Sequence, residues 1–389
     1  MMSKSGNMPL IKRDIINKIR RECSEYKVCL HPDAGNACGE TIVGAHTVSR
    51  HPFLLSISCG EKRKFVYEVI IIPERDNHIK IDDVEIESAS EFYGFCDKHD
   101  RIMFFCIEGR EFICDLDVVF SLSYRAVAHG VYGFRTHGKF DKENLRRIVD
   151  LVSFLNGNVI TEENIRDIVG GGNACIDEKT RNKISNLIDC GDEKFYEAKQ
   201  VYLNYCKEKY ISWRKKAISR ISNAKKFNAI FKIYKDMPEN NYKFLRYCYL
   251  TYDGNIGFAC SSSFGYDELY CTLHIHVCPI QNSSVNNGIN KTVVILSWNS
   301  ENREIPDRVM SNIFSNDVNM LANYILFKSI TQHGNIFFNK IFLENNKERI
   351  EKSIKKFLLK YTSRTEFIQD ENIYNIIGNI PPEYKSDIF

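Results

Sequence analysis

The segments CLHPDAGNAC at 29–38 and FCDKHD at 95–100 decide how the N-terminal part of this chain folds. The first is a loop containing proline and glycine, with a cysteine at each end. The second holds a cysteine and a histidine one helical turn apart. Zinc favours four Cys or His ligands in a tetrahedron, and two local pairs of this kind can be brought together by the fold. The pattern predicts a structural Zn²⁺ held by Cys29, Cys38, Cys96 and His99.

The same segments leave the ligand set open at one place. His31 lies inside the loop and is an alternative ligand in place of Cys29 or Cys38. A further alternative is that these thiols and histidines bind no metal. Cys96 opens a predicted helix, where exposed amide groups stabilise a thiolate, and this favours the metal site.

The order of these elements resembles a known family of zinc modules. A loop with two ligands, a short strand that ends in Ala45-His46 and a helix that opens with Cys-x-x-His-Asp follow one another. Over roughly residues 29–105 this resembles a treble clef, and in particular the zinc-stabilised HNH (His-Me finger) nucleases. The resemblance implies that His46 is the general base that activates water, and that Asp100 is a ligand of a catalytic Mg²⁺ or Mn²⁺. It implies DNA or RNA as substrate and, by analogy, a role in bacterial defence against foreign nucleic acid.

Two other classes of function stay open. Ala45 stands where the nucleases usually carry a metal-binding side chain. The main alternative is therefore a non-catalytic, zinc-scaffolded sensor or interaction protein that binds nucleic acid or a protein partner. The third hypothesis places the activity in the segment 240–389.

Composition and length exclude several classes. The 389 residues suffice for two domains, and 53 Lys and Arg against 50 Asp and Glu leave a formal charge of +3, which argues against a wholly basic nucleic-acid coat. There is no P-loop, no Gly-x-Gly-x-x-Gly after a strand, no Gly-x-Ser-x-Gly and no His-Glu-x-x-His. The N-terminus does not resemble a secretory signal, no stretch predicts a membrane span, and 14 cysteines suit a reducing compartment, so we expect a cytoplasmic protein that has no membrane partner.

The chain divides into three parts that differ in residue composition and in predicted secondary structure. A zinc module with flanking helices is predicted at 1–156, a linker with three consecutive glycines at 157–176, and a helical and antiparallel-sheet domain at 177–389. The predicted class is α+β.

Periodicity predicts the main elements. Helices are expected at 8–28, 50–58, 95–108, 117–156, 192–235, 307–330 and 338–362. Strands are expected at 41–44, 64–73, 244–250, 257–263, 268–279 and 291–300, the last four in one antiparallel sheet.

Two further patterns allow a functional and a structural interpretation. The segment from Lys194 to Lys235 is rich in Lys and Arg, with interleaved aromatic residues: Tyr196, Tyr202, Tyr205, Tyr210 and Phe227. It could bind phosphates and stack bases, or form an amphipathic helix with the aromatic residues inside. His274, His276 and Cys278 share one face of a predicted strand, which suits either a metal pair or the polar face of a half-buried strand.

Overall fold

The chain forms two compact units, each built from two separate stretches of sequence. The first contains residues 1–26 and 133–225, and the second contains 27–132 and 226–389. Each unit therefore takes residues from both of the ranges predicted as domains, 1–156 and 177–389. The computed structural model describes residues 26–35, 38–39, 41–72, 78–108, 112–157, 176, 178–238, 242, 245–254, 256–265, 272–280, 291–299 and 335–360.

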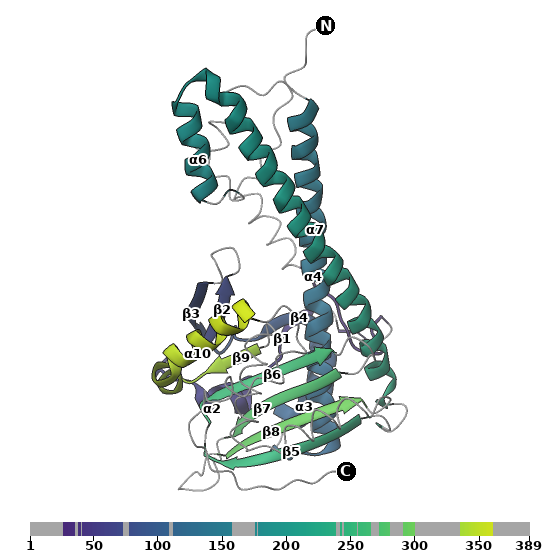
Figure 1. Ribbon diagram of the computed structural model, residues 1–389. Coiled ribbons are helices and arrows are strands. Elements are labelled where there is room, and N and C mark those ends of the chain that lie inside the picture. The colour runs from purple at the N-terminus through teal and green to yellow at the C-terminus, as the bar shows by residue number, and fades with distance from the viewer. Residues whose placement is uncertain are drawn as a thin grey trace. The chain divides into compact units, whose positions relative to one another are not determined.

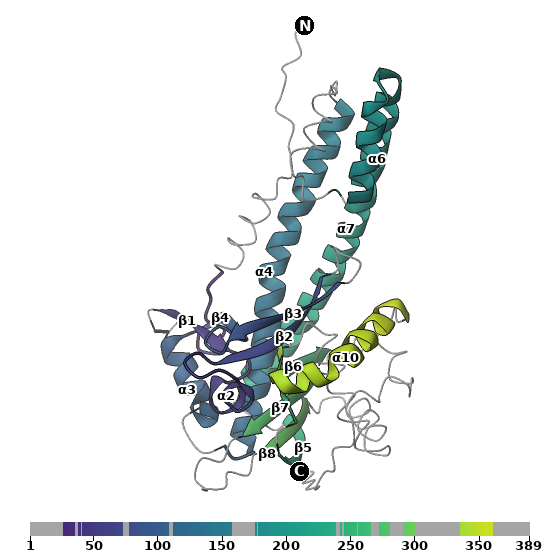
Figure 2. The same ribbon diagram turned by 90° about the vertical axis from the view of Figure 1, so that its left-hand side faces the viewer.

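A two-stranded sheet and a helix form the part of the second unit where the zinc module is predicted (Figure 2). Strand β1 (Ile42–His46) pairs antiparallel with β4 (Glu91–Cys96), and helix α3 (Asp97–Glu108) follows β4 directly. The predicted helix at 95–108 thus begins at Asp97, because Phe95 and Cys96 pair with β1. A short helical segment, η1 (Arg50–Leu54) and α2 (Leu55–Ile57), follows β1 where a helix at 50–58 is predicted.

A seven-stranded antiparallel sheet also lies in the second unit (Figure 1). Its strand order is β3-β2-β9-β6-β7-β8-β5. The strands are β2 (Phe65–Ile72), β3 (His78–Glu85), β5 (Leu245–Asp253), β6 (Phe258–Gly265), β7 (Thr272–Ile280), β8 (Lys291–Asn299) and β9 (Asn335–Phe338). The prediction of four antiparallel strands between 244 and 300 is confirmed. The hairpin β2–β3 comes from the N-terminal third of the chain and joins the others through β9.

Helix α4 (Leu116–Gly157) begins between the zinc module and this sheet. Asp115 caps its first turn by accepting a hydrogen bond from the backbone N–H of Val118 at 2.9 Å. On one side Ser123 contacts Ser297 of β8, and on the other the hydroxyl of Tyr124 donates to the carbonyl of Leu30. The first turns of α4 are buried on nearly every side for this reason, and they tie the metal-binding loop to the core.

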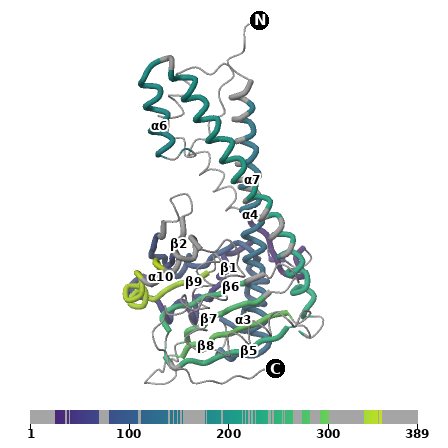
Figure 3. Tube along the Cα trace, viewed as in Figure 1, coloured from purple at the N-terminus to yellow at the C-terminus, as the bar shows by residue number. Residues whose placement is uncertain are grey.

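The first unit is helical (Figure 3). It contains α4 from Gly133 onward, α6 (Glu178–Asp189) and most of α7 (Asp192–Asp236), and a turn at Gly191 joins α6 to α7. The long helix predicted at 192–235 is confirmed. The last described helix, α10 (Lys340–Lys360), belongs to the second unit and contacts β2.

Helices and an antiparallel sheet together confirm the mixed class predicted as α+β. The predicted helix at 307–330 lies outside the described residues. The predicted helix at 8–28 and linker at 157–176 lie there too, apart from Tyr26–Val28, Gly157 and Ile176.

Candidate metal centre

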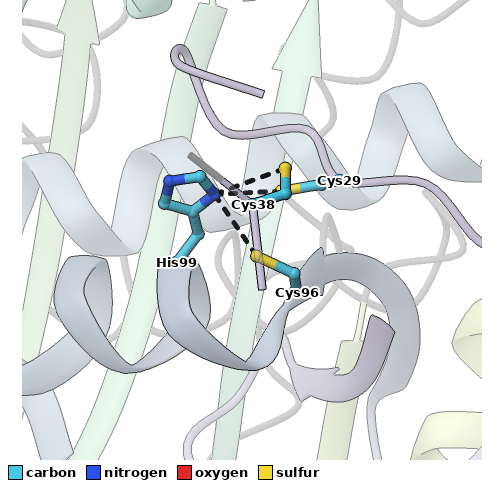
Figure 4. Close-up of side chains that lie close together, drawn as sticks. All are labelled: Cys29, Cys38, Cys96 and His99. Atoms are coloured by element: carbon cyan, nitrogen blue, oxygen red, sulfur yellow. Dashed lines mark hydrogen bonds between the residues drawn. The ribbon is translucent and has the colours of Figure 1, made fainter. Parts of the chain in front are cut away.

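The pairing of β1 with β4 brings together the four predicted zinc ligands (Figure 4). Cys29 and Cys38 lie in the loop before β1, Cys96 ends β4, and His99 lies in the first turn of α3. Because Ile42 of β1 pairs with Cys96, the end of the loop lies beside the start of the helix. The two local pairs thus meet at one point.

The geometry of this group suits a tetrahedral ion. The Sγ atoms of Cys96, Cys29 and Cys38 lie 3.3, 3.4 and 3.8 Å from Nδ1 of His99. All four ligand atoms lie within 4.8 Å of one another. Around zinc, with Zn–S of about 2.3 Å and Zn–N of about 2.0 Å, neighbouring ligand atoms of a tetrahedron are about 3.6 Å apart. The group can therefore hold a metal ion such as zinc.

Backbone donors around the sulfur atoms favour the thiolate forms that bind metal. The N–H of Gly39 donates to Sγ of Cys96 at 3.2 Å, and the N–H of Gly35 donates to Sγ of Cys38 at 3.4 Å. Burial raises the pKa of Cys96, but hydrogen bonds from the backbone of His99 and Gly39 bring the net pKa below the usual value. Cys96 is thus prepared for metal binding by the fold itself.

His31 lies next to the four ligands and is not one of the group. Its ring stacks on that of His99, with centroids 3.8 Å apart and planes 3° from parallel. Its Nδ1 accepts a hydrogen bond from the backbone N–H of Asp33 at 3.1 Å. In the structure His31 therefore contacts the candidate ligand His99. From the sequence alone, His31 is an alternative ligand in its own right.

His46 ends β1, and its imidazole is held in one orientation. Its Nδ1 lies 2.8 Å from the carbonyl oxygen of Ala89. A carbonyl only accepts, so Nδ1 carries the proton and Nε2 of the neutral ring keeps a lone pair. Burial lowers the pKa of His46 below its usual value, and the side chain is only 8% exposed. The ring is therefore neutral at pH 7, with Nε2 as the basic atom.

The residues after His46 are fixed by hydrogen bonds to the turn that leads into β4. The backbone N–H of Thr47 donates to the carbonyl of Ser90 at 3.1 Å, and that of Val48 donates to the hydroxyl of Ser90, also at 3.1 Å. The hydroxyl of Ser49 donates to Glu108 at 2.8 Å. This network gives the end of β1 little freedom, as a preorganised site requires.

One face of α3 carries a charged network around Arg125 of α4. Asp100, Phe104 and Glu108 follow at four-residue intervals and so share that face. The guanidinium of Arg125, fully buried, lies 3.7 Å from the centre of the Phe104 ring and donates to Oε1 of Glu108 at 3.0 Å. Burial raises the pKa of Asp100, and the charge of Arg125 opposes that rise. Asp100 therefore lies in the field of a buried cation.

The structure does not place His46 and Asp100 in a ready-made cation site. Within the part of the chain that is described, the Cys–His group is the one set of three or more Cys, His, Asp or Glu side chains placed to share an ion. Oδ1 of Asp100 is buried, and the described residues offer it no hydrogen-bond partner. The described residues around His46 and Asp100 therefore form no preassembled site for a second metal.

Arg125 and its contact with Glu108 were not predicted from the sequence. A signal was present, because Arg125 is a lone charge in the apolar run SLSYRAVAHGVY of α4. Glu108 is spaced to share a helix face with Asp100. Nothing in the sequence, however, indicates that α4 packs against that face of α3.

The basic helix α7 keeps most of its described aromatic residues inside. Tyr202 and Tyr205 are buried, and Tyr210 is half-buried, while Tyr196 is 69% exposed. Stacking on nucleic-acid bases needs accessible rings, so these positions favour the amphipathic-helix interpretation.

The histidine strand β7 is also internal. His274 and His276 are fully buried. His274 contacts the Tyr234 hydroxyl through Nε2 at 2.6 Å and the Ser263 hydroxyl through Nδ1 at 2.7 Å, and His276 contacts Ser261 at 3.0 Å. Hydroxyl groups thus contact both nitrogens of His274 and Nδ1 of His276, and the described residues around the pair form no group that could share a metal ion.

Comparison of the chain with protein-family models, with curated proteins and with solved structures found no match in any of the three. None of the described helices is both long enough and apolar enough to cross a membrane.

Proposed function

We propose that this chain is a zinc-stabilised nucleic-acid-binding protein whose N-terminal module is of the treble-clef, HNH-like type. We further propose that His46 acts in it as the general base of phosphodiester hydrolysis. The observation that carries the proposal is the Cys–His group, with ligands from a loop and from a helix start, directly beside the strand that ends in His46.

The order of elements supports the family resemblance. Two ligands lie in a loop, β1 and β4 pair antiparallel, and α3 supplies His99 immediately after Cys96. The residues between β1 and β4 include the hairpin β2–β3, which pairs with the other sheet and leaves the β1–β4 pair intact. The module can thus keep its zinc-bound form despite a long insertion.

The state of His46 supports a role as base. A base must be unprotonated and oriented before the reaction begins. The hydrogen bond from Nδ1 to Ala89 orients the ring, and the lowered pKa keeps Nε2 free of a proton at pH 7. In the proposed reaction, Nε2 takes a proton from water as the water oxygen attacks phosphorus, and the P–O bond to the leaving oxygen breaks. A divalent cation such as Mg²⁺ or Mn²⁺, when bound, would stabilise charge on the phosphate.

A second candidate is a non-catalytic zinc scaffold for nucleic acid or a protein partner. The observation that favours it is the charge balance on α3. The positive charge of Arg125 faces Asp100 and Glu108, which leaves less negative charge to attract a cation. Ala45 adds no ligand from β1. In this candidate His46 is a buried polar residue that holds the turn before β4.

One experiment separates the two candidates. Plasmid, single-stranded DNA and RNA are incubated with the protein in Mg²⁺, in Mn²⁺ or in a chelator, and binding is measured by fluorescence anisotropy at several salt concentrations. His46→Ala is compared with His137→Ala, a control at an exposed position on α4. Cleavage that is lost only in His46→Ala supports the nuclease. Salt-sensitive binding without cleavage, by wild type and by both variants, supports the scaffold. Cleavage that persists in His46→Ala contradicts the assignment of His46 as the base.

A further inference from the structure

His31 shows the closest ring-to-ring approach around the metal centre. Its imidazole lies parallel to that of the ligand His99, with a centroid separation of 3.8 Å and an interplanar angle of 3°. The two residues come from different elements, since His31 belongs to the loop between Cys29 and Cys38, and His99 belongs to α3. The stack therefore joins the two halves of the ligand set.

The loop holds the ring of His31 at its edge. The backbone N–H of Asp33 donates to Nδ1 of His31 at 3.1 Å, and the N–H of Ala34 donates to the His31 carbonyl at 3.0 Å. Only 13% of the His31 side chain is exposed. The ring cannot turn away from His99 without losing the hydrogen bond to Asp33.

The orientation of His99 decides whether its Nδ1 faces the three sulfur atoms. Rotation of an imidazole about the Cβ–Cγ bond moves Nδ1 away from a metal, so ligating histidines in proteins are held by outer partners. Such partners usually form hydrogen bonds. Here a parallel aromatic ring lies against the face of His99 and leaves its Nδ1 within 3.8 Å of all three sulfur atoms.

We propose that His31 is a positioning residue of the zinc site, which fixes the ring plane of His99 by stacking and shields that ring from water. This inference rests on the zinc site of the proposed function. It assigns His31 a role in the rate of metal loss rather than a place among the ligands. Its own Nδ1 is occupied by Asp33, and the Cys–His group supplies four ligand atoms without it.

The test compares His31→Phe with His31→Leu in the zinc-loaded full-length protein. Phenylalanine retains a flat ring that can stack, whereas leucine fills similar space without one. Zinc release to a chromophoric chelator is timed, and the visible spectrum of the Co²⁺-substituted protein is recorded. We expect release from His31→Leu to be about tenfold faster than from wild type, in the range found for outer partners of metal ligands, and release from His31→Phe to stay within about threefold. The Co²⁺ spectrum of both variants should keep the thiolate charge-transfer bands of an unchanged ligand set.

Three results would overturn the inference. Equal release from wild type and His31→Leu would show that the stack has no effect on the metal. Equally fast release from both variants would show that the aromatic face is not what matters. A Co²⁺ spectrum that changes to one with fewer nitrogen ligands would make His31 a ligand. Wild-type protein that binds no zinc would instead contradict the zinc site itself, and zinc content measured on the same samples separates that failure from the others.

Discussion

The guanidinium of Arg125 lies over the ring of Phe104 in α3 and donates a hydrogen bond to Glu108, one turn further along α3. Arg125 is fully buried, so its charge has to be balanced by neighbouring carboxylates. Glu108 and Asp100 lie on either side of Phe104 and supply that balance. Helix α4 is thereby joined to α3, the helix that carries His99 and follows Cys96.

Removal of this buried cation should destabilise the second unit. We expect Arg125→Ala to lower the free energy of unfolding by about 3 kcal/mol, because Glu108 loses its partner and a cavity forms beside Phe104. Urea unfolding of the zinc-loaded protein measures it. Arg146→Ala is the control, since Arg146 is 62% exposed in its ion pair with Glu143 and its loss should cost much less stability. Equal losses in the two variants would contradict a special role for Arg125.

Asp100 should depend on Arg125 for its contribution to stability. Asp100→Asn is expected to be about 1 kcal/mol less favourable in the wild-type background, where Arg125 attracts the carboxylate, than in Arg125→Met, where there is no buried charge to balance. A double-mutant cycle in urea gives the coupling. Additive effects would show that Asp100 is not coupled to Arg125, and would strengthen the assignment of Asp100 as a cation ligand.

Zinc content should depend on the four ligands and on no other cysteine tested. Cys96→Ser is expected to reduce the metal from about one zinc ion per chain to near zero, because thiolate sulfur is lost from the tetrahedron. Elemental analysis after dialysis measures this. Cys190→Ser is the control, since Cys190 is exposed and lies outside the group. Full zinc content in Cys96→Ser would refute the site.

The buried histidines of β7 should make the fold sensitive to acid. Burial lowers the pKa of His276 to about 3, against a usual value of 6.5. Between these two pH values the unfolded chain binds a proton at His276 and the folded chain does not. The free energy of unfolding is therefore unaffected by this residue above pH 6.5 and falls as the pH drops toward 3. At pH 5 the loss due to His276 is about 2 kcal/mol. In His276→Asn, which can keep the hydrogen bond to Ser261, the loss between pH 7 and pH 5 should be smaller by that amount. Parallel pH curves for the two proteins would contradict the effect.

Under the proposed nuclease activity, His46 fixes the direction of the pH dependence. Burial lowers the pKa of His46 below its usual value of 6.5, so the neutral ring is still the major form at pH 6.5. The single-turnover cleavage rate should keep more than half of its pH 7.5 value at pH 6.5 and fall further in more acidic solution. A rate that has already halved at pH 7 would exclude His46 as the base in this environment.

The local parts of the structure could be predicted from the sequence, and the long-range parts could not. Spacing alone places Cys96 and His99 one turn apart, and alternation alone indicates the strands β5 to β8. The partners of Asp100 could not be found in this way, because its interaction with Arg125 depends on how α4 packs on α3. The short strand β9 has too few residues to show an alternating pattern. The sequence instead predicts a helix at 338–362, which begins at the last residue of β9.

The position of strand β9 late in the chain affects how the protein folds during its synthesis. The hairpin β2–β3 is synthesised early, yet its sheet partner β9 is the last described strand to leave the ribosome. Until then one edge of the hairpin is unpaired and open to other chains. Two fragments cut at the glycine-rich segment 157–176 would each carry such an edge. We therefore expect them to aggregate separately and to recover solubility when they are produced together in one cell.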